Sequence, residues 1–184
     1  MEIMEAIKGR RSVRKYAETS ITDADLEALL EAARWAPSWA NTQCWRLVIV
    51  KDKVTKSEIA ETVNPGNRAA DGVRNAPIVI VACAQLGLAG HYKGTVATDK
   101  GDWFMFDVAL AMHNVTLAAH ARGLGTVHVG LFDAKKVAQV IGVPEDVAVV
   151  EILPVGHPEV VPQAPPRKEL SEFVFYDKYG APTV

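Results

Sequence analysis

The chain has 184 residues, of which 49% are hydrophobic and 23% are charged, so it is long enough to bury one well-packed core. We expect a single domain over residues 1–184. The formal net charge of −2 provides no general positive field for nucleic acid or an anionic membrane. No stretch reaches the length of a membrane span, and residues 1–14 lack the apolar core of a signal peptide. We therefore expect a cytoplasmic protein with small-molecule substrates and no nucleic-acid or membrane partner.

The first half of the chain predicts several short elements. A short amphipathic helix is expected over residues 3–8, followed by the basic stretch RRSVRKY at 10–16 as a loop. Thr22 and Asp25 have the spacing of a capping box, and they begin a helix that Pro37 must end. The elements expected next are a structured loop at 37–45, a strand at 46–50, a helix at 55–63, a turn at 64–67 and an apolar strand at 77–83.

The second half predicts one long central helix. Residues 102–122 have helical spacing with frequent alanine, which lets another backbone approach closely, and Gly123 is a natural residue to follow the helix end. The other elements expected are a glycine-rich irregular segment at 87–101, a turn and strand at 123–130, a helix capped by Asp133 that ends near Gly142, and a strand at 147–155. The irregular segment is the best candidate for a mobile lid, since long irregular loops are often functional.

The tail after Gly156 has a different character. Residues 157–166 contain four prolines, which exclude both a ladder and a helix. The tail should therefore run across a surface. It ends in side chains that are costly to leave in water, namely Phe173, Val174, Phe175, Tyr176 and Tyr179.

The sequence offers no metal or nucleophile signature. Cys44 and Cys83 lie far apart without a CxxC spacing, and we expect both to be reduced. The histidines form no HExxH or i, i+4 metal pair, and no GxSxG elbow occurs. His128 would more commonly be a core histidine than a catalyst. No metal site is therefore expected.

The basic stretch is the densest cluster of charge. Arg10, Arg11, Ser12, Arg14 and Lys15 place four cations and a hydroxyl within six residues, and arginine binds phosphate oxygens through two parallel N–H groups. A solvated basic turn explains the charge equally well. Arg167 and Lys168 form a second basic pair in the tail.

The stretch GLGTVHVG at 123–130 has no GxGxxG motif opening a helix, and no P-loop occurs anywhere, so a classical Rossmann dehydrogenase is disfavoured. Its glycines let a flat ligand lie against the backbone, although a helix cap followed by a turn is the simpler reading.

Taken together, these segments resemble the nitroreductase family over nearly the whole chain. RRSVRKY resembles the family's phosphate-binding start, PSWANTQCW its P-S-x-x-N-x-Q-P-W loop, and GDWFMFDVALAMHNVTLAAHARGLGT its central helix and glycine turn. Arg167 falls where the family has a C-terminal basic residue. Cys44 is a departure, because many members have proline there, and it bears on the rigidity of the loop and on substrate preference more than on the flavin.

The resemblance implies an α+β sandwich, with a mainly antiparallel central sheet surrounded by helices, in a homodimer that binds flavin mononucleotide (FMN). Periodicity alone predicts only an α/β protein. By the resemblance, Arg10, Ser12 and Arg167 hold the FMN phosphate, Arg11 contributes at least its backbone, and Arg14 lies toward the pyrimidine edge. The further cofactor residues implied are Pro37, Ser38, Trp39, Asn41 and Gln43 from the other subunit, Asn67 at the ring edge, and His128, Val129 and Gly130 along the ring.

The resemblance also implies the activity. NADH or NADPH would donate hydride through FMN to an electron-poor acceptor such as a nitroaromatic or a quinone, the two substrates alternating in a ping-pong mechanism at one face. Because the flavin would carry the chemistry, no indispensable catalytic side chain is implied. Trp39, Trp103 and Phe104 are candidates for the apolar wall of that space, although the last two are as readily core or interface residues. The alternatives are another flavin-dependent reaction of the family, such as dehalogenation or flavin breakdown, and a non-catalytic FMN-binding protein.

Overall fold

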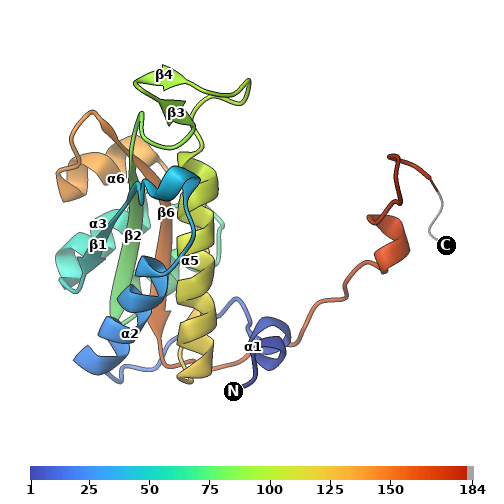
Figure 1. Ribbon diagram of the computed structural model, residues 1–184. Helices are drawn as coiled ribbons and strands as arrows, with labels where there is room; N and C mark the ends of the chain where they lie inside the picture. The colour runs from blue at the N-terminus through green and yellow to red at the C-terminus, as the bar shows by residue number, and fades with distance from the viewer. Residues whose placement is uncertain (182–184) are drawn as a thin grey trace.

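The computed structural model describes residues 1–181 of the chain. A four-stranded sheet forms its middle layer, with helices on both faces (Figure 1). The strands, in their order across the sheet, are β1 (Trp45–Val50), β2 (Ile78–Gln85), β6 (Val147–Gly156) and β5 (Gly125–Thr126). Every neighbouring pair of strands is antiparallel. The expected α+β sandwich is thereby confirmed, and the α/β class that periodicity favoured is wrong.

The two faces of β2 explain why its sequence is apolar without interruption. Ile78 and Ile80 pack into one core cluster, whereas Val79 and Val81 pack into a second cluster on the opposite face. The helices on the first face are α2 (Asp23–Arg34) and α5 (Phe104–Ala121), and those on the second are α3 (Lys53–Glu61), α4 (Ala69–Asn75) and α6 (Ala134–Ile141). A strand buried on both faces needs no alternation of polar residues.

Several expected helix ends are confirmed in atomic detail. The Thr22 side chain accepts a hydrogen bond from the Asp25 N–H at the start of α2. Asp133 caps α6 in the same way, and Gly142 ends that helix in the left-handed conformation. Gly123 has a φ of 75° directly after α5 and its C-cap residue, as expected for the glycine that ends a helix.

Other boundaries differ from the expectation. Helix α3 begins at Lys53 because Asp52 accepts a hydrogen bond from the Thr55 N–H and so caps it two residues earlier than predicted. The short helix α4 follows the turn at 64–67 and was not predicted. The strand expected at 123–130 is reduced to β5 and one isolated bridge between Val129 and Ile152.

The segment at 87–101 contains a minimal hairpin, made of β3 (His91–Tyr92) and β4 (Thr95–Val96), beyond the N-terminal end of α5 (Figure 1). Asp102 ties the base of this segment down, because its carboxylate accepts hydrogen bonds from the backbone N–H groups of Gly87 and Phe104. The rest of the segment is irregular, as the sequence predicted.

The first helix, α1 (Ile3–Gly9), packs against α5 and leaves apolar side chains in solvent. Ile3 is 61% exposed and Met4 is 53% exposed. A helix that shows apolar residues on its outer side has a surface available for another protein chain. None of the helices among the described residues is both long and apolar enough to cross a bilayer.

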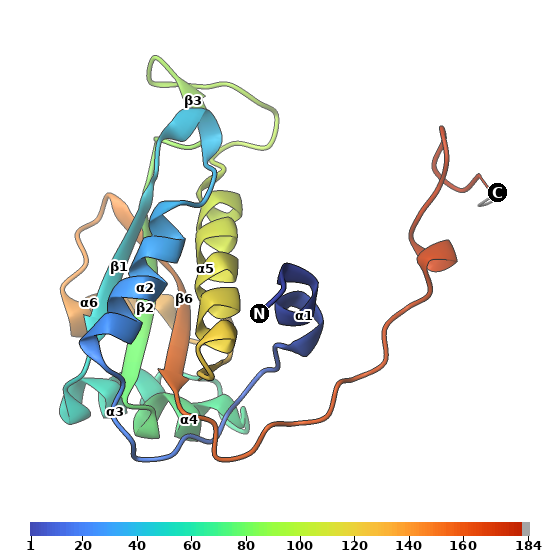
Figure 2. The ribbon, with the colours of Figure 1, turned by 60° about the horizontal axis from the view of Figure 1, so that its bottom comes forward.

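The tail passes the basic loop at 10–16 and then leaves the body of the protein (Figure 1). Beyond the first proline-rich residues it runs away from the sheet and helices in both views, through the short helix η2 (Leu170–Glu172) (Figures 1 and 2). Phe173 is 57% exposed and Tyr179 is 94% exposed. In the isolated chain, therefore, the tail follows a surface only along the basic loop, and its aromatic end lies exposed.

Candidate cofactor site

The basic loop that follows α1 is fixed to the edge of the sheet. Ser12 forms a parallel bridge with Thr126, and the Val13 N–H donates to the Thr126 carbonyl at 2.9 Å. Gly125 makes this approach possible, because a Cβ there would lie 2.7 Å from the Val13 side chain. The loop therefore continues the sheet beyond β5, with its basic residues held next to a rigid edge.

Tyr16 connects the same loop to strand β6. The Tyr16 hydroxyl lies 2.6 Å from the carbonyl oxygen of Val13 and 3.2 Å from that of Pro154, and both share its one proton as acceptors. Burial raises the pKa of Tyr16, so that the hydroxyl remains a donor at neutral pH. The contact joins the basic loop to β6.

The tail brings Arg167 to this loop. Arg167 and Arg10 line one cavity of about 300 Å³, together with Arg11, Ser12, Arg14, Pro162, Gln163 and Pro165. None of the ion pairs between described residues includes these arginines. Four guanidinium groups around one small cavity with no paired carboxylate favour the binding of an anion.

The individual arginines are arranged differently within this cluster. The Arg11 guanidinium turns back onto its own backbone and donates to the carbonyls of Lys8, at 2.6 Å, and Arg10, at 2.8 Å. Arg14 donates to the Ser12 carbonyl at 3.1 Å. The hydrogen bonds of Arg167 are longer and go only to neighbouring proline carbonyls. Among the contacts of the described residues, Arg10 is the one guanidinium group of the four without a hydrogen bond to the protein's own backbone.

A larger cavity of about 840 Å³ adjoins the first, since Ser12, Arg14 and Pro162 line both. Asn67, which the resemblance placed at the ring edge, lines this larger cavity. Lys15, Gly66, Arg68, Asp71 and Val160 complete its lining. Sequence reasoning missed Arg68 and Asp71, and the available signal was their position directly after the turn that carries Asn67.

The stretch 128–130 continues along the same sheet edge. Thr126 lies beside Ser12, and Val129 pairs with Ile152 about 10 Å further along at the usual rise per residue of an extended chain. The Val129 side chain is buried in the core of the second face, and its backbone N–H and C=O both bond Ile152 of β6. Gly130 is open, because a Cβ placed there would meet no atom within 4 Å.

His128 is not the core histidine that its sequence context favoured. Its side chain is 41% exposed, and Nδ1 lies 2.7 Å from Oε2 of Glu151 on β6. Its charge and that of Arg10 contribute, after burial, to the lowered pKa of His113 on α5.

The loop at 37–45 is strained. It contains the short helix η1 (Trp39–Asn41), and three of its residues have positive φ without being glycine: Ala40 at 44°, Asn41 at 57° and Gln43 at 48°. Such backbone conformations cost on the order of 1 kcal/mol each and persist where the surroundings hold them. Within the loop, the Ser38 hydroxyl accepts a hydrogen bond from the Gln43 N–H at 3.0 Å. Pro37, Asn41 and Gln43 are exposed.

The structure does not bring this loop to the basic cavity within one chain. Trp39 lies at the N-terminal end of α5, where its N–H contacts Asp107, whereas Arg10 shares a cavity with His120 at the C-terminal end. The rise of an α-helix separates Asp107 from His120 by about 20 Å. The two groups of predicted site residues accordingly lie at opposite ends of the longest helix (Figure 1).

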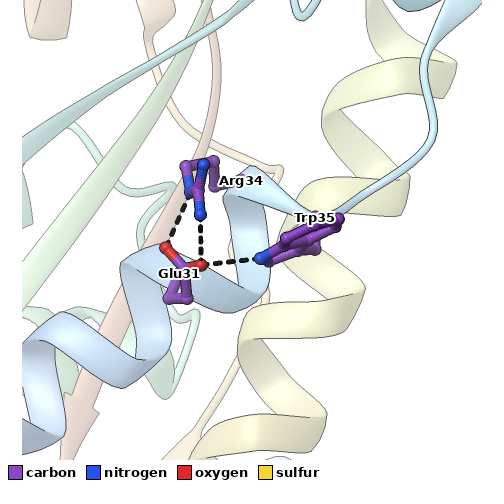
Figure 3. Close-up of polar contacts among 3 residues, drawn as sticks. All are labelled: Glu31, Arg34 and Trp35. Atoms are coloured by element: carbon purple, nitrogen blue, oxygen red, sulfur yellow. Dashed lines mark hydrogen bonds and ion pairs between the residues drawn. The ribbon is translucent and has the colours of Figure 1, made fainter.

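A polar cluster at the end of α2 borders the strained loop (Figure 3). Arg34 donates to both carboxylate oxygens of Glu31, at 2.7 and 2.5 Å, and the Trp35 indole N–H donates to Oε1 at 2.6 Å. The Arg34 contact, followed by that of Trp35, lowers the pKa of Glu31 to about 2. Trp35 is 73% exposed. Arg34 and Trp35 line a cavity of about 300 Å³ with Ala36, Asn41 and Gln43.

An aromatic cluster connects the loop to the hairpin segment. The ring centroids of Trp39 and Trp103 are 5.4 Å apart, as are those of Trp103 and Phe106. The Trp103 indole N–H donates to the Thr98 hydroxyl at 2.9 Å. Trp39, Trp103 and Phe104 pack partly buried against the core, whereas Phe106 is 54% exposed. The interpretation of Trp103 and Phe104 as core residues is confirmed in part, because both side chains are partly buried against the core.

Comparison with known proteins agrees with this arrangement. The sequence model described as "Nitroreductase family" matches residues 7–157. A protein of Archaeoglobus fulgidus, provisionally named an NADH dehydrogenase/NAD(P)H nitroreductase, is 30% identical over 162 residues, which cover 86% of each chain. A 5,6-dimethylbenzimidazole synthase of Rhodospirillum rubrum is 31% identical over 167 residues, covering 81% of this chain and 78% of that protein.

A solved structure extends the comparison to three dimensions. The NADPH:FMN oxidoreductase of Vibrio harveyi in complex with NAD⁺ superposes with a TM-score of 0.83 at 28% identity, covering 96% of this chain and 77% of that one. The family match, the relatives and the shared fold cover the same region that carries the basic loop, the strained loop and the central helix. The chain therefore belongs to the nitroreductase family of flavin- and NAD(P)H-dependent oxidoreductases.

Proposed function

We propose that this protein is an FMN-dependent oxidoreductase, with one cofactor-binding domain over residues 1–184, that uses NADH or NADPH to reduce an electron-poor acceptor such as a nitroaromatic or a quinone. The observation that carries the proposal is the convergence of Arg10, Ser12 and Arg167 on one cavity at the sheet edge. That cavity has the charge and size for a phosphate monoester. It is continuous with a larger cavity that Asn67 lines.

The residues present fit FMN better than a dinucleotide. The guanidinium groups of Arg10 and Arg167 and the Ser12 hydroxyl supply donors for one terminal phosphate. From Ser12 the sheet edge leads about 10 Å to Val129 and Gly130, which suits a short linear chain between a phosphate and a ring. The open backbone at Gly130 leaves room for a planar ring.

When bound, FMN would supply the hydride chemistry of both half-reactions. The protein's own residues would bind the cofactor and orient it and the substrates. Arg14 lies on the side of the larger cavity, where a positive charge would stabilise negative charge on a nearby ring. The backbone of residues 128–130 would support the ring. Trp39 and Trp103 would form an apolar wall that excludes water and lets the two substrates use the same space in turn.

The separation of the two groups of residues supports a homodimer. Pro37, Ser38, Trp39, Asn41 and Gln43 lie at the opposite end of α5 from Arg10, so we propose that they complete the site of the partner subunit. The exposed apolar side chains on α1 and the exposed aromatic tail provide the surface for such an assembly. The tail would then cross a surface, as the sequence suggested, on the partner.

The experiment that tests this function begins with the colour of the purified protein. We expect a yellow protein whose heat-released chromophore co-elutes with FMN and not with FAD. Anaerobic addition of NADH or NADPH should bleach the flavin absorbance, and a nitroaromatic or a quinone should restore it. A protein that binds neither flavin would overturn the proposal, whereas one that binds FMN but does not bleach would be a non-catalytic FMN-binding protein.

A second candidate, flavin breakdown, is favoured by one specific observation. The relative from Rhodospirillum rubrum is named a 5,6-dimethylbenzimidazole synthase, and that product carries the same dimethylbenzene ring as a flavin. The reduced protein exposed to oxygen should be analysed by chromatography for 5,6-dimethylbenzimidazole. Its formation at the expense of FMN would favour this candidate over acceptor reduction.

A further inference from the structure

A buried carboxylate lies directly beneath the strained loop. Asp107, in the first turn of α5, is only 1% exposed. Both of its carboxylate oxygens lie 3.1 Å from the backbone nitrogen of Trp39. None of the ion pairs between described residues includes Asp107, so this carboxyl group is buried without a cationic partner. A buried carboxyl group of this kind is costly, and its retention indicates a specific task.

The second donor to Asp107 comes from the other end of the same loop. The Cys44 thiol, which is fully buried, lies 3.7 Å from Oδ2 of Asp107. Burial, followed by the charge of Asp107, raises the pKa of Cys44 to about 12, so that the thiol keeps its proton at neutral pH. Asp107 thus contacts the loop at Trp39 and at Cys44, on either side of the three residues with positive φ.

We infer that Asp107 is the positioning residue that holds the loop at 37–45 in its strained conformation and thereby presents Trp39, Asn41 and Gln43 to the ring of the bound flavin. The part concerning flavin rests on the proposed function. The part concerning the loop rests on the contacts alone. The strain at Ala40, Asn41 and Gln43 needs an external hold, and a carboxylate that bonds both ends of the loop supplies one.

The role of the cysteine follows from the same geometry. Cys44 stands where many members of the family have proline, a residue that restricts the backbone directly. In this chain the thiol restricts the loop through its contact with Asp107. The rigidity expected to be lost with the proline is therefore provided by a side-chain contact.

The test measures amide hydrogen exchange of the holoprotein in Asp107→Ala, Asp107→Asn and Val108→Ala. Val108 is the matched control, since it is fully buried next to Asp107 on the same helix, in the core cluster that also contains Cys44, but has no polar group to accept a hydrogen bond from the loop. In Asp107→Ala the protection of the Trp39 amide should fall at least tenfold more than that of Val81 in β2, which reports global unfolding. Asp107→Asn keeps one acceptor and should restore part of the protection. Val108→Ala should lower the exchange protection of the Trp39 and Val81 amides by the same factor.

A second arm measures flavin affinity by fluorescence titration of the apoprotein. If the loop contacts the ring, Asp107→Ala should lower the affinities for FMN and for riboflavin by the same factor, about tenfold. Val108→Ala should leave both affinities within about twofold of the parent values. Unchanged relative protection of Trp39 in Asp107→Ala would overturn the positioning role. If the parent protein bound no flavin, the proposed function would fail and the exchange arm would still decide the role of Asp107.

Discussion

Arg10 and Arg167 line the same cavity, although one precedes every strand of the sheet and the other follows the last. The cavity exists because the proline-rich tail passes the basic loop before it leaves the body of the protein. Two guanidinium groups that converge in this way are expected to share one ligand.

Replacing Arg10 or Arg167 with alanine tests that expectation. Each change should weaken FMN binding by about 1.5–3 kcal/mol, because a charged hydrogen bond to phosphate is lost. This corresponds to roughly tenfold or more in dissociation constant. The double variant should deviate from additivity, since both residues contact one partner.

Riboflavin is the control for these variants, because it carries the ring without the phosphate. Parent and variants should bind riboflavin almost equally. Unchanged FMN affinity in the double variant would mean that the arginines are surface charge, and a parallel loss of riboflavin binding would point to damage of the fold or the dimer.

Complementation between two defective variants tests the shared site. One variant carries Arg10→Ala with Arg167→Ala, and the other carries Asn41→Ala with Gln43→Ala. If each site takes residues from both subunits, refolding an equimolar mixture should restore parental FMN affinity in about a quarter of the sites, because half of the dimers are mixed and each has one intact site.

The mixture should be compared with each variant refolded alone. A site built within one chain would give no recovery in the mixture. Light scattering should show about twice the chain mass for the parent protein, and a stable flavin-loaded monomer would contradict both the shared site and the role given to the tail.

Two glycines at the same sheet edge should respond differently to alanine. Gly125→Ala places a Cβ 2.7 Å from Val13, so it should destabilise the fold by about 1–3 kcal/mol through overpacking. Gly130→Ala meets no atom within 4 Å and should leave the free energy of unfolding of the apoprotein unchanged or slightly increased.

Flavin affinity then separates two interpretations of Gly130. If the ring lies against this backbone, Gly130→Ala should lower the affinities for FMN and riboflavin by the same factor. Chemical denaturation should show that the fold is intact. An affinity equal to that of the parent protein would place the ring elsewhere along the edge.

Protonation of Glu31 is expected to change the fluorescence of Trp35. The contacts from Arg34 and Trp35 lower the pKa of Glu31 from its ordinary 4.5 to about 2, so their stabilising effect is fully present above pH 4.5 and is lost as the pH falls through about 2. The fluorescence of Trp35, taken as the difference between the parent and Trp35→Phe, should therefore titrate near pH 2.

Glu31→Gln is the control, because it removes the titrating group and should abolish this transition. Far-UV circular dichroism must remain constant over the same range, which separates the local change from acid unfolding. A midpoint near pH 4.5 in the parent protein would show that the three side chains do not form the cluster in solution.

The sequence by itself determined the elements whose signals are local. Thr22 and Asp133 fix helix starts through hydrogen bonds to residues three positions away, and Gly123 and Gly142 fix helix ends through their own backbone conformation. The apolar run of β2 shows that the strand is buried on both faces. The basic loop was visible as a cluster of charge for the same reason, since its residues are adjacent in sequence.

The tertiary structure decided what depends on partners distant in sequence. Whether the charge at Arg10 belongs to a site or a solvated turn depends on Arg167, which only the path of the tail brings close. His128 has its hydrogen-bond partner, Glu151, in a neighbouring strand, and the role of Asp107 depends on a loop that precedes it by more than sixty residues. A carboxylate on the buried face of α5 was the one sequence signal for Asp107. Its meaning required the folded chain, because burial and hydrogen-bond partners are properties of packing.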